Sequence, residues 1–390
     1  MCIMNNNNNN NKSNHYNEKI KLNFILLISL SVSIVLISVV IFLSTDEEKN
    51  IFKLSLGQEI KHTVPLDKIL SGGPPQDGIP SIDNPKFQSV QEADEILEDS
   101  ELVLGLNING DIRVYPLQIL VWHEIVNDVV GDQPVAVTYC PLCFTNQVFN
   151  RTLNDGNTVE FGTSGKLYNS NLVMYDRKSN SLWSQALGEG IVGEYAGVKL
   201  ERIPFDVAYW KEWKELYPES KVLSRDTGSV RPYGADPYGD YYTNDLILFP
   251  VANDDKRLGL KEIIIGLENN NKDQYKAYKL QEIETNKVIN DVIGEDKKIA
   301  LVSLEPFMIR VFDRVIDGND DGNKIVVDLF YNETTNTLID RVTGSELNFD
   351  GKFINKQLQG KKLERLPMDQ GFWFEWAAFH PETEVFSIYK

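Results

Sequence analysis

The chain has 390 residues, of which 42% are hydrophobic and 25% are charged, so it is long enough for two globular domains with a sizeable core. Its formal net charge of -18 excludes a strongly basic surface, and we therefore expect no nucleic-acid partner. Three cysteines are too few for a disulfide scaffold.

The N-terminal residues 1–21 are polar and include an asparagine run from Asn5 to Asn11, which predicts a disordered cytoplasmic tail. An uncharged apolar run follows from Leu22 to Leu43, about the length that a helix needs to cross ~30 Å of hydrocarbon. Lysines precede this run and acidic residues follow it, so the positive-inside rule predicts a single transmembrane helix at the cell membrane with extracytoplasmic C-terminal domains. A cleaved signal peptide is the alternative.

Residues 44–99 are predicted to be a tether that leads into a Gly/Pro-rich loop. Within them, residues 71–85 contain four prolines and three glycines, which precludes regular secondary structure. Such a segment is more often a connector than a binding loop. Asp77 and Asp83 are therefore weak candidates for a functional site.

From about residue 100 onward the sequence repeats itself. Residues 127–131 (NDVVG) resemble residues 290–294 (NDVIG), an offset of 163 residues. The same offset relates residues 199–204 (KLERIP) to residues 362–367 (KLERLP). The repetition predicts two tandem copies of one domain, residues 100–228 and 261–390, joined by a tyrosine-rich connector at 229–260.

Within the first copy, alternating and β-branched runs predict strands and helical spacing predicts two helices. The expected strands are 102–106, 112–115, 135–139, 147–151, 159–162, 172–176 and 181–185, and the expected helices are 117–127 and 206–217. Because strands outnumber helices without alternating with them, the predicted fold class is α+β, with antiparallel-rich sheets in both copies and the transmembrane helix in front. Four tryptophans, Trp210, Trp213, Trp373 and Trp376, are expected in the core.

The chemistry is expected at a Cys-x-x-Cys pair, Cys140 and Cys143, at the end of the β-branched run 135–139. Pro141 cannot donate to a strand ladder, so the thiols should lie on a turn. His123 and Glu124 lie upstream of the pair.

These four residues are specific to the first copy. At the 163-residue offset the second copy has Asn286, Lys287, Ser303 and Pro306. The turn that ends at Lys166 is likewise unmatched. Positions kept in both copies are the better candidates for holding the fold, and positions unique to one copy for function. The second copy is therefore interpreted as degenerate, supporting one site in the first.

The preferred hypothesis is a soft-metal site. Two thiolates and an imidazole, from Cys140, Cys143 and His123, suit copper or zinc, with Glu124 and Met174 as weaker ligands. Glu124 could instead accept a hydrogen bond from the imidazole.

Three alternatives stay open. The pair could be a thiol–disulfide redox centre whose thiolate is favoured by Lys166 or His123. Cys140 could be a catalytic nucleophile with His123 as its base. Lastly, the chain could be a non-catalytic extracellular binding module in which Cys140 and Cys143 form a structural disulfide.

Several long motifs, in this order, closely resemble the domain-of-unknown-function 3179 (DUF3179) family. They are residues 123–128 (HEIVND), 138–143 (TYCPLC), 161–177 (FGTSGKLYNSNLVMYDR) and 181–185 (SLWSQ). The loop at 77–80 (DGIP) and residues 237–239 (PYG) also fit this family, so the resemblance covers roughly residues 70–390. It implies no activity, and the reaction, the small ligand and any protein partner stay open.

Overall fold

The computed structural model describes residues 60–269, 272–318 and 323–388. Its contacts divide the chain into two units, Met1–Ile60 and Lys61–Lys390, and the fold below is that of the second unit. The predicted tail and the predicted transmembrane helix at 22–43 lie outside the described residues. Within the described ranges, no helix has the length and apolar character needed to cross a membrane.

The fold is built mostly of β-strands, which corrects the predicted α+β class. The α-helices of the described residues are short, namely α2 (Val90–Asp94), α3 (Leu117–Leu120), α4 (Trp210–Leu216), α5 (Leu280–Asn286) and α6 (Trp373–Phe379). Single 3-10 turns add η1 (Leu66–Lys68), η2 (Gly239–Thr243) and η3 (Lys356–Leu358). The helices connect and cover sheets and do not form a layer of their own.

Two five-stranded sheets hold most of the first half. The first sheet has the order β1 (Ile69–Ser71), β8 (Phe161–Tyr168), β9 (Asn171–Asp176), β10 (Leu182–Ser184) and β11 (Glu189–Val192). The second has the order β12 (Asp206–Tyr209), β3 (Leu102–Ile108), β4 (Asp111–Pro116), β13 (Lys221–Leu223) and β2 (Phe87–Gln88). All neighbours in them are antiparallel except β4 and β13.

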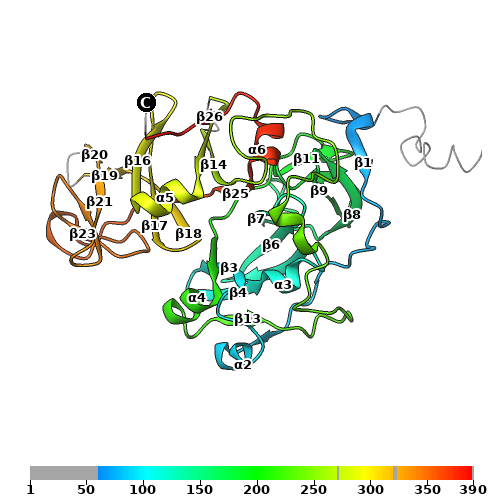
Figure 1. Ribbon diagram of the computed structural model, residues 1–390, viewed down its shortest axis with the longest axis horizontal. Coiled ribbons are helices and arrows are strands. Elements are labelled where there is room, and N and C mark those ends of the chain that lie inside the picture. The colour runs from blue at the N-terminus through cyan, green and yellow to red at the C-terminus, as the bar shows by residue number, and fades with distance from the viewer. Residues whose placement is uncertain (1–59, 270–271, 319–322, 389–390) are drawn as a thin grey trace, which may run out of the picture. The chain divides into compact units, whose positions relative to one another are not determined.

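A seven-stranded sheet joins the two halves of the chain (Figure 1). Its order is β26 (Glu384–Val385), β15 (Gln274–Lys279), β14 (Ile263–Asn269), β25 (Asp369–Phe372), β7 (Thr145–Asn150), β6 (Gln133–Cys140) and β5 (Ile125–Val130). The junction is the antiparallel pair of β25 with β7, in which Gln370 lies opposite Asn146. Strands of the second half are thus continuous with the strand that carries Cys140.

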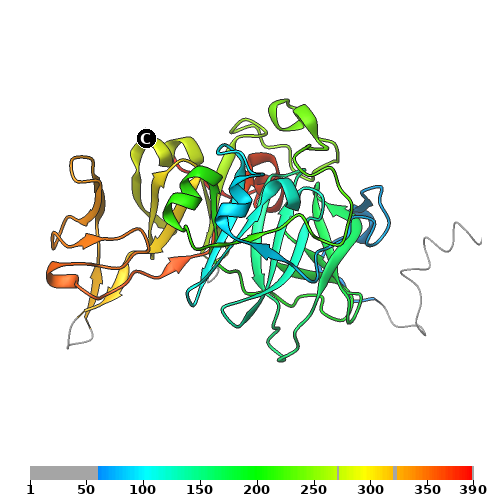
Figure 2. The ribbon, with the colours of Figure 1, turned by 90° about the horizontal axis from the view of Figure 1, so that it is seen from below.

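The rest of the second half forms smaller sheets, which lie far from β1 in both views (Figures 1 and 2). One has the order β16 (Val288–Ile293), β17 (Lys297–Glu305), β18 (Met308–Asp313) and β24 (Arg365–Leu366). A hairpin pairs β19 (Val315–Asp317) with β20 (Lys324–Val326), and a third group joins β21 (Leu329–Asn332), β22 (Thr337–Asp340) and β23 (Glu346–Leu347).

Elements of the two halves correspond at the 163-residue offset. Strand β4 corresponds in this way to β15, β5 to β16, β7 to β18 and β12 to β25, and helix α4 corresponds to α6. In each half a tryptophan of the last helix covers a strand glycine. A Cβ atom added to Gly105 would lie 2.0 Å from the Trp213 ring, and one added to Gly266 would lie 2.4 Å from the Trp376 ring. We propose that this correspondence reflects the internal duplication expected from the sequence.

The four tryptophans are fully or almost fully buried, which confirms their predicted core role. The predicted helix at 117–127 is wrong beyond Leu120, because residues 125–130 form strand β5 and pair with β6. Four of these six residues are Ile or Val, which pack well on a pleated sheet. The predicted helix at 206–217 similarly begins as strand β12 and becomes helical only at Trp210.

Candidate functional site

The cysteine pair lies on a turn at the end of β6, as its sequence predicted. The backbone N–H of Cys143 donates to the carbonyl oxygen of Cys140 over 3.2 Å. Both thiols face the carbonyl oxygen of Ser170, at 3.0 Å from the Cys143 sulfur and 4.0 Å from the Cys140 sulfur. Both cysteines are buried and free, so the structure does not contain the structural disulfide that was one alternative.

The His123 ring connects two segments that are remote in sequence. Its Nδ1 atom lies 2.7 Å from the Pro80 carbonyl oxygen, and its Nε2 atom lies 2.6 Å from the Tyr233 hydroxyl. A carbonyl oxygen only accepts, so Nδ1 carries the proton and Nε2 accepts the hydrogen bond from Tyr233. Burial lowers the pKa of His123 and favours this neutral form. Both ring nitrogens are therefore used to hold the fold together.

The predicted soft-metal function is contradicted. Within the described residues, no group of three or more His, Cys, Asp or Glu side chains is arranged to hold a metal ion. His123 is committed to Pro80 and Tyr233, and Met174 is fully buried in β9, next to Trp183 of β10. The spacing of the motifs could not show that the imidazole is bound by residues 43 and 110 positions away.

A pocket of about 260 Å³ opens beside the cysteine turn. Its apolar wall includes Ile79, Leu142, Leu167, Leu172, Leu248 and Phe249. Its polar groups belong to Glu124, Thr163, Lys166 and Tyr238. Leu142 lies between the two cysteines in sequence, so the pocket and the thiols share one turn. The pocket brings together two of the residues that are unique to the first copy, Glu124 and Lys166.

Glu124 lines this pocket and is a nearly buried residue, with 9% of its surface exposed. No hydrogen bond or ion pair to this carboxyl group is found in the described ranges of the chain. Burial raises its pKa to about 8, so the group is mostly protonated at neutral pH. The backbone at Glu124 has φ 59°, but Lys287 at the 163-residue offset has φ 60°. The unusual backbone therefore belongs to the fold, whereas the carboxyl group is particular to this pocket.

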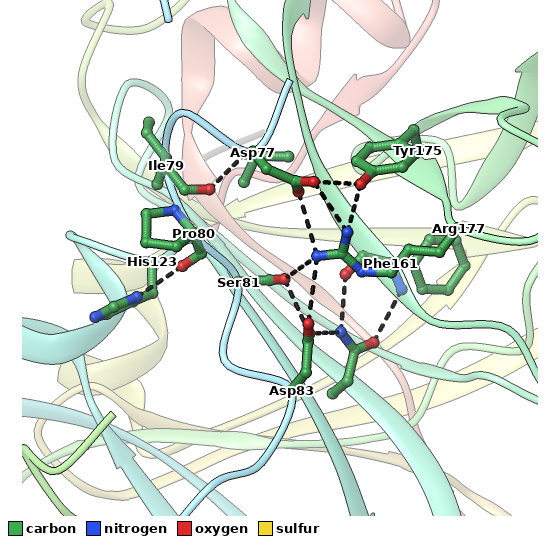
Figure 3. Close-up of polar contacts among 11 residues, drawn as sticks. Asp77, Ile79, Pro80, Ser81, Asp83, His123, Phe161, Tyr175 and Arg177 are labelled. Carbon is green, nitrogen blue, oxygen red and sulfur yellow. Dashed lines mark hydrogen bonds and ion pairs between the residues drawn. The ribbon is translucent and has the colours of Figure 1, made fainter. Parts of the chain in front are cut away.

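The loop that forms one wall of the pocket is tied down by Arg177 (Figure 3). The guanidinium donates to Asp77 over 2.9 and 3.2 Å and reaches Ser81 at 3.0 Å and Asp83 at 3.3 Å. The Tyr175 hydroxyl also donates to Asp77, at 2.5 Å. Asp77 and Asp83, weak candidates by sequence, thus position the loop and are not aimed into the pocket.

We expect Arg177→Met to loosen this loop and to lower the free energy of unfolding by about 1–2 kcal/mol, since it removes several charge-assisted hydrogen bonds. Amide hydrogen exchange at Asp77, whose N–H donates to the Thr163 carbonyl oxygen, should speed up. Arg341→Met is the matched control, because Arg341 lies at an exposed ion pair 3.6 Å from Asp328. Equal effects of the two substitutions would contradict the assigned role of Arg177.

Behind the cysteine turn lies a buried polar cluster that the sequence did not reveal. Asn171 donates to Gln185 over 2.8 Å and lies 3.2 Å from Glu375, which comes from α6 of the second half. Burial, together with the nearby carboxyl group of Asp369, raises the pKa of Glu375. Glu375 has a glutamate, Glu212, at the matching position of the first copy. The comparison of the two copies selected residues unique to one copy, so it overlooked Glu375. Only the pairing of β25 with β7 could have indicated it.

A family model described as "Protein of unknown function (DUF3179)" matches residues 76–383, which is most of the chain. No curated protein and no solved structure matches the chain. The matched range contains the cysteine turn, Glu124, Lys166 and the acids of the second half. The chain belongs to the DUF3179 family.

Proposed function

We propose that the pocket beside the cysteine turn binds a small, mainly apolar molecule with an anionic head group. We further propose that an ionised Glu124 takes up a proton from solvent when this molecule binds. One observation carries this proposal, namely a glutamate residue that is 9% exposed, lines a pocket and has no hydrogen bond or ion pair to its carboxyl group from the described residues. A buried polar group without a partner costs free energy, and natural proteins retain such groups mainly where a ligand or a reaction uses them.

The polar groups of the pocket favour an anion. A protonated Glu124 donates a hydrogen bond, and Lys166 contributes a positive charge from the wall formed by β8. The Tyr238 hydroxyl is a further donor on the connector side. An ionised Glu124 would instead repel the ligand, so binding of the anion and protonation of Glu124 support each other.

The remaining walls favour a compact apolar body. Six of the lining residues are Ile, Leu or Phe, and the cavity is somewhat smaller than the pockets that hold drug-sized ligands. A single ring or a short branched chain bearing one carboxylate matches this space. Benzoate and cyclohexanecarboxylate are therefore suitable probes.

The test is a calorimetric titration of the full chain with benzoate at about pH 8.5, in buffers of different ionisation enthalpy. We expect saturable binding with uptake of roughly three quarters of a proton per benzoate, because a group with a pKa about 8 is mostly ionised at that pH and becomes protonated in the complex. At pH 6.5 the uptake should approach zero. Lys166→Met should weaken binding about tenfold.

Glu124→Gln is expected to keep the binding of benzoate and to lose the proton uptake, since an amide can still donate a hydrogen bond but does not titrate here. Glu95→Gln is the matched control, because Glu95 is an exposed carboxylate at the end of α2, and it should behave like the unchanged chain. Binding without proton uptake would contradict the role of Glu124. If neither benzoate nor cyclohexanecarboxylate binds, the proposed class of ligand is contradicted.

A further inference from the structure

The two halves of the chain meet at two contacts, here called seams, and each contains a buried aspartate as the first residue of a four-residue strand. In one seam, Asp206 of β12 faces Arg310 of β18. In the other, Asp369 of β25 faces Gln147 of β7. Asp369 corresponds to Asp206 and Gln147 to Arg310 at the 163-residue offset. The two seams are therefore the same arrangement with one partner exchanged.

The seam at Asp206 is fully paired. Arg310 donates to both carboxylate oxygens, at 3.0 and 2.8 Å, and Arg365 donates to the same oxygens at 2.5 and 3.2 Å. The side chains of Asp206 and Arg310 are only 3% and 2% exposed. The two guanidinium groups lower the pKa of Asp206 despite its burial, so this carboxylate is held as an ion.

The seam at Asp369 lacks these donors. Gln147 donates to Oδ2 of Asp369 over 2.8 Å, whereas Oδ1 is buried and has no hydrogen-bonding partner among the described residues. Arg202 corresponds to Arg365 at the 163-residue offset, but it pairs with Glu268 at 2.8 Å and with the carbonyl oxygen of Ala186. The whole Asp369 residue is only 2% exposed. Bulk solvent therefore has little contact with this carboxyl group.

The difference in size between an arginine and a glutamine side chain sets the size of the group that could pair with Asp369. A glutamine side chain has about two fewer non-hydrogen atoms than an arginine side chain, and its amide carries no charge. Other acids nearby, Glu375 and Glu268, add negative charge, which the guanidinium of Arg202 partly offsets. The surroundings thus favour one small cation with several N–H donors.

We propose that Asp369 and Gln147 form a binding site for a small protonated amine, such as ammonium or methylammonium, which takes the role that the Arg310 guanidinium has in the other seam. Asp369 is not among the residues that line the Glu124 pocket, so this site is separate from the proposed function. Burial raises the pKa of Asp369 to about 7 when no cation is bound. Below that pH the amine therefore binds with release of a proton from Asp369 to solvent, so binding strengthens as pH rises to about 7 and levels off above it.

The test measures the thermal unfolding midpoint of the full chain at about pH 8, in methylammonium chloride and in sodium chloride at the same concentration of about 0.1 M. We expect methylammonium to raise the midpoint by about 2 °C or more relative to sodium. Ammonium should act similarly. Tetramethylammonium, which is too large and has no N–H donor, should give the same midpoint as sodium.

Two variants make the result specific. Gln147→Arg restores an internal guanidinium, so it should unfold at a higher temperature and should no longer respond to methylammonium. Asp369→Asn should also lose the response while retaining the fold, because an amide fills nearly the same volume. Equal midpoints in methylammonium and sodium for the unchanged chain would overturn the proposal. A response that survives in either variant would place the cation elsewhere and would also overturn it.

Discussion

Replacing Arg310 with glutamine is expected to lower the free energy of unfolding by about 3–5 kcal/mol, because it removes one partner of a buried ion pair. Arg310 is 2% exposed and holds Asp206, Asp350 and the Tyr217 hydroxyl together at 2.8–3.0 Å. Without it, Asp206 keeps only Arg365 as a charged donor. Urea unfolding followed by tryptophan fluorescence measures the loss directly.

The matched control for Arg310→Gln is Arg341→Gln. The Arg341 side chain is 59% exposed, and its ion pair with Asp328 spans 3.6 Å, so this change should stay within about 0.5 kcal/mol. A loss below about 1 kcal/mol for Arg310→Gln would show that the seam at Asp206 does not depend on the ion pair.

Replacing Glu124 with glutamine is expected to change how stability depends on pH, by several kcal/mol at alkaline pH. The pKa of Glu124 is about 8 in the folded chain, against an ordinary value of 4.5 that applies when the chain is unfolded. Between these values the folded state binds more protons than the unfolded state, so stability falls as pH rises, by up to about 1.4 kcal/mol per pH unit. The full contribution is present below about pH 4.5 and is lost as pH passes 8.

The measurement is a set of urea unfolding curves from pH 5 to pH 8.5 for the unchanged chain and for Glu124→Gln. We expect the difference in unfolding free energy to move in favour of the variant by about 4 kcal/mol across this range. Taking the difference isolates Glu124, because Asp369 and Glu375 titrate alike in both proteins. Glu95→Gln should run parallel to the unchanged chain. Parallel curves for Glu124→Gln would mean that this carboxyl group is already ionised at neutral pH.

Local sequence patterns predicted those parts of the fold that depend on neighbouring residues. The β-branched run at 135–139 became part of β6, and the cysteines lie on the turn that Pro141 implied. Helical spacing failed at 117–127, since residues 125–130 are held by pairing with β6, and that pairing outweighs any local preference. The mostly β-sheet class followed from such pairings, which a single sequence does not display.

The candidate site was predicted in part. Comparison of the copies singled out Glu124 and Lys166, and the structure places both at one pocket. The same comparison grouped His123 with the cysteines, although its ring is bound by Pro80 and by Tyr233 of the connector. Glu375 escaped notice because it meets Asn171 only when the second half completes the sheet. Contacts between residues about 200 positions apart leave no local pattern in the sequence.

The insertion of β25 between β14 and β7 has a consequence for synthesis of the chain. Residues 369–372 leave the ribosome long after residues 145–150, and until they emerge β7 has an unpaired edge next to the cysteine turn. The backbone N–H of Phe372 then donates to the Cys143 carbonyl oxygen over 2.8 Å and closes that edge. The nascent first half is thus expected to carry two accessible thiols and an open sheet edge until β25 has been synthesised, a period in which it depends on protection from aggregation.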